Sequence, residues 1–230
     1  MTELSIGGLA RWSSCDWPGQ LVATVFLQGC PWRCRYCHNP HLLPARSDGE
    51  IAWREVLAFL QARRGLLDGV VFSGGEPTIQ AALPEAMDAV RALGFGVGLH
   101  TGGPAPERLK AVLPLVDWVG FDVKAPFDDY ARITGVPGSG EAARSSLKLL
   151  LASGVACDLR TTVHPALLDE TALARLADDL AALGTTTRLQ PFRVHGCIDP
   201  ELIAQAQADH RPHPGRSAGP RLPEPARHPR

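Results

Sequence analysis

Three cysteines near the start of the chain have a spacing that suits metal chemistry. Cys30, Cys34 and Cys37 form a C-x3-C-x2-C pattern that directly follows the apolar run 21–27. Closely spaced cysteine thiolates are the usual ligands of iron-sulfur clusters. A cubane cluster has four irons and this loop supplies three thiolates, so one iron would keep a position for a ligand other than cysteine. We expect chemistry at that position.

Zinc is the alternative occupant of this loop. The three cysteines together with His38 or Cys15 would make a four-ligand zinc site. Zinc modules usually carry a second cysteine pair of matching spacing, and the sequence has none, so the cluster is favoured. Cys15, Cys157 and Cys197 are isolated in the sequence, and we expect them to be small buried side chains. Their spacing offers no second cluster.

Six apolar segments alternate with helical patterns along the rest of the chain. Such alternation predicts a parallel sheet built from right-handed βαβ units. Unusual polar residues follow many different strands, which favours a barrel over a single crevice, and we therefore predict a partial (β/α)6 barrel of parallel strands. Residues 5–19 lack a clear period and could include a short edge strand. The expected strands cover residues 21–27, 69–72, 95–100, 118–123, 155–163 and 186–189, and the expected helices cover 51–63, 80–93, 106–113 and 141–152, with a fifth helix that Asp169 caps and Gly184 ends.

Several polar residues lie where these strands end. The turn Ser73-Gly74-Gly75-Glu76-Pro77 exposes bare backbone that could approach a small ligand. Asp122 and Lys124 alternate on one strand and should point to the same face, although they could merely pair with each other. Further polar residues at strand ends are Thr101, Arg160, Thr162, Gln190 and Arg193.

Composition and charge exclude several classes of protein. Residues 211–230 hold five arginines and one glutamate, so the rest of the chain carries a net charge of −5 and has no general footprint for nucleic acid. No segment has the ~18 apolar residues of a membrane span. The run ending in Cys30 resembles a lipoprotein cleavage site but lacks its basic and apolar flanks. Clustered cysteines indicate a reducing compartment, so we expect a cytoplasmic protein.

The C-terminal end differs in composition from the rest of the chain. Residues 211–230 contain six prolines and few apolar side chains, which cannot bury enough surface to offset the entropy of ordering. We therefore divide the chain into a barrel domain, residues 1–205, and a disordered Pro/Arg-rich tail, residues 206–230.

The cysteine loop, joined to the Gly-Gly-Glu-Pro turn, resembles the radical S-adenosylmethionine superfamily over about residues 5–200. The resemblance implies a 4Fe-4S cluster held by Cys30, Cys34 and Cys37, with S-adenosylmethionine bound to the fourth iron. It also implies that no side chain need act as a general base. The residues that would bind S-adenosylmethionine are Tyr36, His38, Gly74, Gly75, Glu76, Thr101, Asp122, Lys124, Arg160 and Arg193. Arg193 occupies a place where relatives often carry histidine.

Within the superfamily, Asp16-Trp17-Pro18-Gly19 and Cys37-His38-Asn39-Pro40 look most like the glycyl-radical activating enzymes. The likeness is strongest to activating proteins of anaerobic ribonucleoside-triphosphate reductase. It implies reductive cleavage of S-adenosylmethionine to a 5'-deoxyadenosyl radical, which generates a glycyl radical on a partner enzyme. A one-electron donor such as flavodoxin or ferredoxin would supply the electron.

Two other functions stay open at this point. One is a radical enzyme that acts on a small molecule, similar to 7-carboxy-7-deazaguanine synthase. The other is a non-catalytic metal-binding module or electron carrier. Cleavage of S-adenosylmethionine on reduction would exclude the carrier, and transfer of a radical to protein would separate the activating enzyme from the small-molecule enzyme.

Overall fold

The structure is a computed structural model that describes residues 4–46 and 51–209. A seven-stranded sheet with the order β1-β2-β3-β4-β5-β6-β7 forms its centre. The strands are β1 (Ile6–Ser13), β2 (Val22–Leu27), β3 (Gly69–Gly74), β4 (Gly96–Thr101), β5 (Trp118–Asp122), β6 (Ala156–Val163) and β7 (Arg188–Pro191). Each strand from β2 to β7 pairs in parallel with the next, whereas β1 pairs with β2 in antiparallel register.

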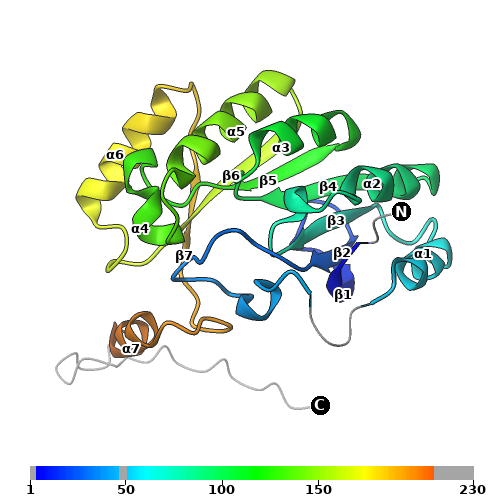
Figure 1. Cartoon of the computed structure of the whole chain (residues 1–230), viewed down its shortest axis with the longest axis horizontal. Coiled ribbons are helices and arrows are strands. Elements are labelled where there is room, and N and C mark those ends of the chain that lie inside the picture. Colours follow the sequence, from blue (N-terminus) through cyan, green and yellow to red (C-terminus); the bar gives the residue numbers. More distant parts are fainter. Residues whose placement is uncertain (1–3, 47–50, 210–230) are drawn as a thin grey trace, which may run out of the picture.

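The six parallel strands and the edge strand confirm the fold expected from the sequence. Helices alternate with the parallel strands, and Figure 1 shows α2, α3, α5 and α6 along one side of the curved sheet. The sheet ends at β1 and β7, so it forms a partial barrel. The helices are α1 (Trp53–Gln61), α2 (Leu83–Ala92), α3 (Pro106–Val112), α4 (Tyr130–Thr134), α5 (Ser139–Ser153), α6 (Glu170–Ala181) and α7 (Pro200–Asp209).

Burial explains why the central strands could be predicted from the sequence. The first four residues of β3 and of β5 are buried, as expected for strands covered on both faces. Helix α6 buries Leu176 and Leu180, and the Asp169 side chain accepts a hydrogen bond from Ala172 N at 2.8 Å, which confirms the predicted cap. The exception is β7, which is mostly exposed at the end of the sheet.

Two helices were not expected. The five-residue helix α4 fills part of the connection after β5, and α7 follows β7. Helix α7 continues to Asp209, past the domain boundary placed at residue 205. Residues 210–230 lie outside the described residues, so disorder of the tail stays a prediction. Within the described residues, no helix is long and apolar enough to span a membrane.

Candidate functional site

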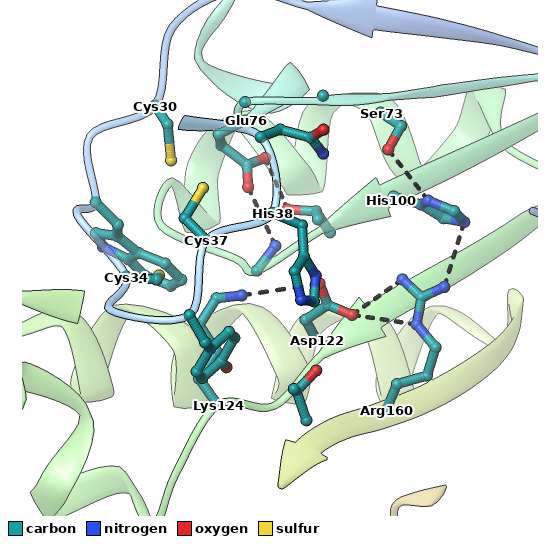
Figure 2. Close-up of a pocket in the computed structure, with 18 of the residues that line it drawn as sticks. Cys30, Cys34, Cys37, His38, Ser73, Glu76, His100, Asp122, Lys124 and Arg160 are labelled. Carbon is teal, nitrogen blue, oxygen red and sulfur yellow. Dashed lines mark hydrogen bonds and ion pairs between the residues drawn. The ribbon is translucent and has the colours of Figure 1, made fainter. Parts of the chain in front are cut away.

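A cavity of about 310 Å³ opens where the parallel strands end beside the cysteine loop. Figure 2 shows side chains from the loop and from β3 to β6 around it. The structure brings almost every predicted site residue to this one cavity. Those that line it are Cys30, Cys34, Tyr36, Cys37, His38, Gly74, Gly75, Glu76, Thr101, Asp122, Lys124 and Arg160, and Thr162 and Gln190 join them.

Backbone hydrogen bonds hold the cysteine loop over the strand ends. Arg33 N and Arg35 N donate to the carbonyls of Thr134 and Ile133, at 2.8 and 3.1 Å, which fastens the loop to α4. Cys30 N donates to the Leu43 carbonyl at 3.2 Å. The loop conformation therefore depends on α4, a helix that the sequence did not predict.

The three thiols of the loop are free and half-buried. Burial raises the pKa of Cys30 to about 12, and burial likewise raises the pKa values of Cys34 and Cys37. Such thiols stay protonated at neutral pH unless a nearby cation stabilises their thiolates. Iron supplies positive charge of that kind, so the chemistry of the donor set fits a cluster bound by three thiolates.

The loop thiols are not drawn together around a single metal position. In the described part of the chain, no group of three or more His, Cys, Asp or Glu side chains is arranged to hold a metal ion. A cubane cluster has a volume of its own and spreads its ligands around it, whereas a single zinc ion draws four ligands to about 2.0–2.3 Å. The other cysteines correct an expectation, because Cys15 and Cys157 are exposed and only Cys197 is buried.

The two glycines at the end of β3 are required by the cysteine loop. A Cβ on Gly75 would lie 2.2 Å from the carbonyl oxygen of Gly29. A Cβ on Gly74, where φ is +111°, would lie 2.4 Å from Leu27 N. Both glycines line the cavity, so the approach of a ligand stays a prediction. The structure adds a second reason for them, because the backbone of residues 27–29 also approaches them closely. The glycines bring the turn and the cysteine loop into contact.

Glu76 is a buried carboxylate with four hydrogen-bond donors. Its Oε1 accepts from the amide and hydroxyl of Thr78, at 3.1 and 2.6 Å, and from the Thr101 hydroxyl at 2.7 Å. Its Oε2 accepts from Gly102 N at 3.1 Å. Burial raises the pKa of Glu76, and these donors oppose that rise. Because Oε2 accepts only one of these bonds, it keeps capacity for a further donor from the cavity.

Asp122 pairs more closely with Arg160 than with Lys124. The Arg160 Nη2 and Nε atoms lie 2.9 and 3.1 Å from Asp122 Oδ1, whereas Lys124 Nζ lies 3.7 Å from Oδ2. Burial acts to raise the pKa of Asp122, but the charges of Arg160 and Lys124 outweigh it, and the pKa is lowered. Asp122 and Lys124 do face the same cavity. Their mutual pairing is the weaker contact, so it does not account for both residues.

Lys124 is a cation among aromatic rings. Its Nζ lies 5.7 Å from the ring centre of Tyr36 and 6.0 Å from that of Trp32. Burial acts to lower the pKa of Lys124, but its acidic neighbours, including Tyr36 and Asp122, outweigh burial and raise it. Lys124 Nζ also lies 3.7 Å from Asp122 Oδ2, and its ammonium group has three donors, so it can pair in addition with a negatively charged group in the cavity.

His100 also lines the cavity, and sequence reasoning missed it. Its Nε2 lies 2.8 Å from the Asp16 carbonyl and its Nδ1 lies 3.2 Å from Ser73 Oγ. A neutral ring that donates from Nε2 and accepts at Nδ1 satisfies both contacts. Burial and the charge of Arg160 lower the pKa of His100, in agreement with the neutral form. As a polar residue near the end of an apolar strand, it carried the same signal as Asp122.

Arg193 is the one predicted site residue that does not line the cavity. Its side chain is exposed, and its carbonyl contacts His38 Nε2 at 2.9 Å. Arg160 is therefore the guanidinium at the cavity (Figure 2).

The sequence is similar to a known family and to named members of it. A family model described as the radical SAM superfamily matches residues 24–178. A protein of Methanocaldococcus jannaschii that is named as a glycyl-radical enzyme activating enzyme is 31% identical over 175 residues, which cover 72% of this chain and 70% of the relative. The pyruvate formate-lyase-activating enzyme of Clostridium pasteurianum is 32% identical over 160 residues, which cover 67% of this chain and 66% of the relative.

Similarity to other relatives covers less of their length. The 7-carboxy-7-deazaguanine synthase of Methanopyrus kandleri is 33% identical over 128 residues, which cover 47% of this chain and 51% of the relative. Among solved structures, anSMEcpe with bound AdoMet has a TM-score of 0.58 at 17% identity and covers 75% of this chain and 50% of its own. TYW1 with a lysine-pyruvate adduct has a TM-score of 0.57 at 17% identity, and the match covers 76% of this chain and 66% of TYW1. At such identity these structures support the fold alone.

Proposed function

The chain belongs to the radical SAM superfamily, and we propose that within it the protein activates a glycyl-radical enzyme. The observation that carries the proposal is the convergence of three free thiols, a buried carboxylate and a cation on one cavity of about 310 Å³. The names of two relatives direct it to activation of a partner enzyme.

In this proposal Cys30, Cys34 and Cys37 would hold a 4Fe-4S cluster, and the fourth iron would bind S-adenosylmethionine. The bound cluster would supply one electron for the cleavage of S-adenosylmethionine to methionine and a 5'-deoxyadenosyl radical. That radical would take a hydrogen atom from a glycine of the partner, which would leave 5'-deoxyadenosine and a glycyl radical. Side chains of this chain act by binding, orienting and excluding water, and none transfers a proton.

Each polar side chain of the cavity matches a part of the zwitterionic ligand. Glu76 Oε2 would accept a hydrogen bond from the amino group of the methionine moiety. Lys124 would pair with its carboxylate. Asp122 and Arg160, which hold each other, would fix the wall beside it, and Tyr36 would lie near the adenine. Thr101 supports Glu76 through the bond to Oε1. Of the remaining predicted residues, Gly74 and Gly75 would offer bare backbone at the turn, and His38 would contact the ligand from the loop. Arg193 does not line the cavity and is left out of the proposed site.

We propose anaerobic ribonucleoside-triphosphate reductase as the partner, on the likeness of the residues around Cys37. A one-electron donor such as flavodoxin or ferredoxin would reduce the cluster, and both reactions would take place in the cytoplasm. The glycine loop of the partner would enter through the side of the barrel, because the sheet ends at β1 and β7. Protection of the strand-end loops from hydrogen exchange on addition of the partner tests this route.

The test of the function begins with reconstitution of the cluster without oxygen. Reductant, S-adenosylmethionine and a candidate reductase are then added, and electron paramagnetic resonance detects a glycyl radical on the reductase. Loss of the radical signal when Cys34 is replaced by alanine is the matched control. Cleavage of S-adenosylmethionine with no radical on any candidate partner would contradict the proposal.

A second function is supported by the similarity to the synthase of Methanopyrus kandleri. In that case the hydrogen atom would come from a small molecule. Turnover of a small-molecule substrate that depends on S-adenosylmethionine, with no radical on any candidate protein partner, would favour it.

A further inference from the structure

The segment after β7 lies across the outer side of the cysteine loop. We call residues 192–201 the strap. Cys197 Sγ donates to the Arg35 carbonyl at 3.5 Å, and His38 Nε2 contacts the Arg193 carbonyl at 2.9 Å. At Gly196, where φ is +83°, a Cβ would lie 2.2 Å from the His38 carbonyl oxygen, so the two backbones touch. The strap therefore contacts the loop at three of its residues, Arg193, Gly196 and Cys197.

Arg35 adds a charged connection between the loop and the strap. It stands between the thiols of Cys34 and Cys37 in the sequence, and its Nε lies 2.7 Å from Asp199 Oδ2. Its Nη2 lies 2.9 Å from Glu201 Oε2. The hydrogen bond from Arg35 lowers the pKa of Asp199, which keeps this carboxylate charged at neutral pH.

Asp199 also starts the helix that follows the strap. Its second oxygen, Oδ1, accepts from the amides of Glu201 and Leu202 at 3.0 and 3.2 Å, as a helix cap does. Leu202 is fully buried, so it anchors α7 to the core. Figure 1 shows α7 lying apart from the other helices, and its N-terminal end carries the contacts to the loop. One carboxylate thus joins the cysteine loop to the start of α7.

Two of the three thiols face this outer side. Cys34 and Cys37 line the main cavity and also a second hollow of about 480 Å³, whose wall includes Arg35, Ile198 and Asp199. Cys30 lines the main cavity but not the hollow. Strap residues Ile198 to Glu201 form part of the wall of this hollow. Movement of the strap away from the loop would therefore give water and solutes freer access to Cys34 and Cys37 from behind.

An ordinary surface ion pair is the simpler explanation of these contacts. Glu201 fits it, because 76% of its side chain is exposed. Asp199 does not, because only 15% of its side chain is exposed and both of its oxygens are used. The contact that holds the strap against the cysteine loop is therefore the Arg35–Asp199 pair, and the Arg35–Glu201 pair contributes little to it. Breaking a partly exposed pair of this kind should raise the open population about fivefold.

We propose that Arg35 and Asp199 are positioning residues that close the strap over Cys34 and Cys37 and so protect the cluster from solvent. The inference rests on the proposed function, in which these cysteines are cluster ligands. The strap would slow the loss of iron without touching the substrate cavity, since neither Arg35 nor Asp199 lines that cavity.

The first experiment measures iron loss from the full-length, reconstituted protein. An iron chelator is added without oxygen, and the decay of the visible absorption of the cluster is followed. Arg35→Met and Asp199→Asn should each lose iron about five times faster than the unchanged protein. Arg35→Lys keeps the charge and should stay within about twofold. Asp158→Asn breaks the exposed Arg188–Asp158 pair, at 2.8 Å, and serves as the matched control with an unchanged rate.

The second experiment needs no cluster and separates the two proposals. The full chain purified without iron is labelled with a thiol reagent, and mass spectrometry gives the rate at each cysteine, with circular dichroism to check folding. In Asp199→Asn, labelling of Cys34 and Cys37 should rise about fivefold while Cys30, which does not line the outer hollow, stays unchanged. Unchanged labelling of Cys34 and Cys37, or an equal rise at Cys30, would overturn the strap. The expected labelling, combined with failure of the same chain to take up a cluster on reconstitution, would support the strap but overturn the proposed function.

Discussion

Replacement of Arg160 by methionine tests the electrostatic account of the cavity. Methionine keeps most of the length of the side chain but removes the guanidinium that lies 2.9 and 3.1 Å from Asp122 Oδ1. Asp122 would then be left with Lys124 alone, at 3.7 Å. His100, whose Nε2 lies 3.5 Å from Arg160 Nη1, would lose a neighbouring positive charge.

The size of the effect follows from the exposure of the pair. Breaking a buried ion pair costs about 3–5 kcal/mol, whereas an exposed pair contributes less than about 1 kcal/mol. Arg160 is 14% exposed but Asp122 is 37% exposed and keeps a second cation, so we expect a loss of about 2 kcal/mol in the free energy of unfolding. Arg160→Lys restores the charge but not the two-point contact, and should lose about half as much.

The pH dependence gives an independent readout of the same contact. In the folded protein the pKa of His100 is lowered from its usual 6.5, so the unfolded chain binds a proton first as the pH falls. Stability is therefore full above about pH 6.5 and decreases below it. Without Arg160, the pKa of His100 should rise and this decrease should become shallower. Urea unfolding at several pH values and NMR titration of His100 measure both quantities; a loss below about 0.5 kcal/mol together with an unchanged His100 pKa would refute the reasoning.

Three further predictions concern the cluster, the ligand and the turn. Cys30→Ala should prevent assembly of the cluster, measured as iron and sulfide per chain, whereas Cys157→Ala should leave both unchanged; a normal cluster in Cys30→Ala would exclude Cys30 as a ligand. Lys124→Met should weaken binding of S-adenosylmethionine about tenfold or more, because a charge-assisted hydrogen bond contributes about 1.5–3 kcal/mol, and equilibrium binding to the reconstituted protein measures it. Gly75→Ala should destabilise the fold by more than about 2 kcal/mol because its Cβ would lie 2.2 Å from the Gly29 oxygen, whereas Gly8→Ala, whose nearest contact would be 3.7 Å, should change stability far less; equal unfolding midpoints would contradict the close approach.

The parallel strands and the cysteine loop could be predicted from the sequence because their signals are local. Strands such as β3 and β5 are continuous apolar runs, and the thiol spacing is itself the pattern that a cluster needs. Asp122 and Lys124 could be placed together because alternate residues of a strand share a face. The cavity therefore follows largely from strand ends that meet at one edge of the barrel.

The rest of the site depends on contacts between distant segments. His100 was predicted only as the end of a strand, because nothing local indicates that Ser73 and the Asp16 carbonyl will surround it. The sequence showed that Arg193 follows β7, but it did not show that the Arg193 side chain would be exposed and away from the cavity. Helix α7 was missed because it buries little beyond Leu202 and is held through Arg35, 164 residues before Asp199.

The origin of the transferred hydrogen atom tests the central claim most directly. The candidate reductase is prepared with glycine in which deuterium replaces both hydrogens of Cα, and is incubated without oxygen with the reconstituted protein, reductant and S-adenosylmethionine. Mass spectrometry of the released 5'-deoxyadenosine then reports where the hydrogen came from. The account predicts one deuterium in each 5'-deoxyadenosine, in proportion to the radical on the reductase. Release of 5'-deoxyadenosine that contains no deuterium would contradict it.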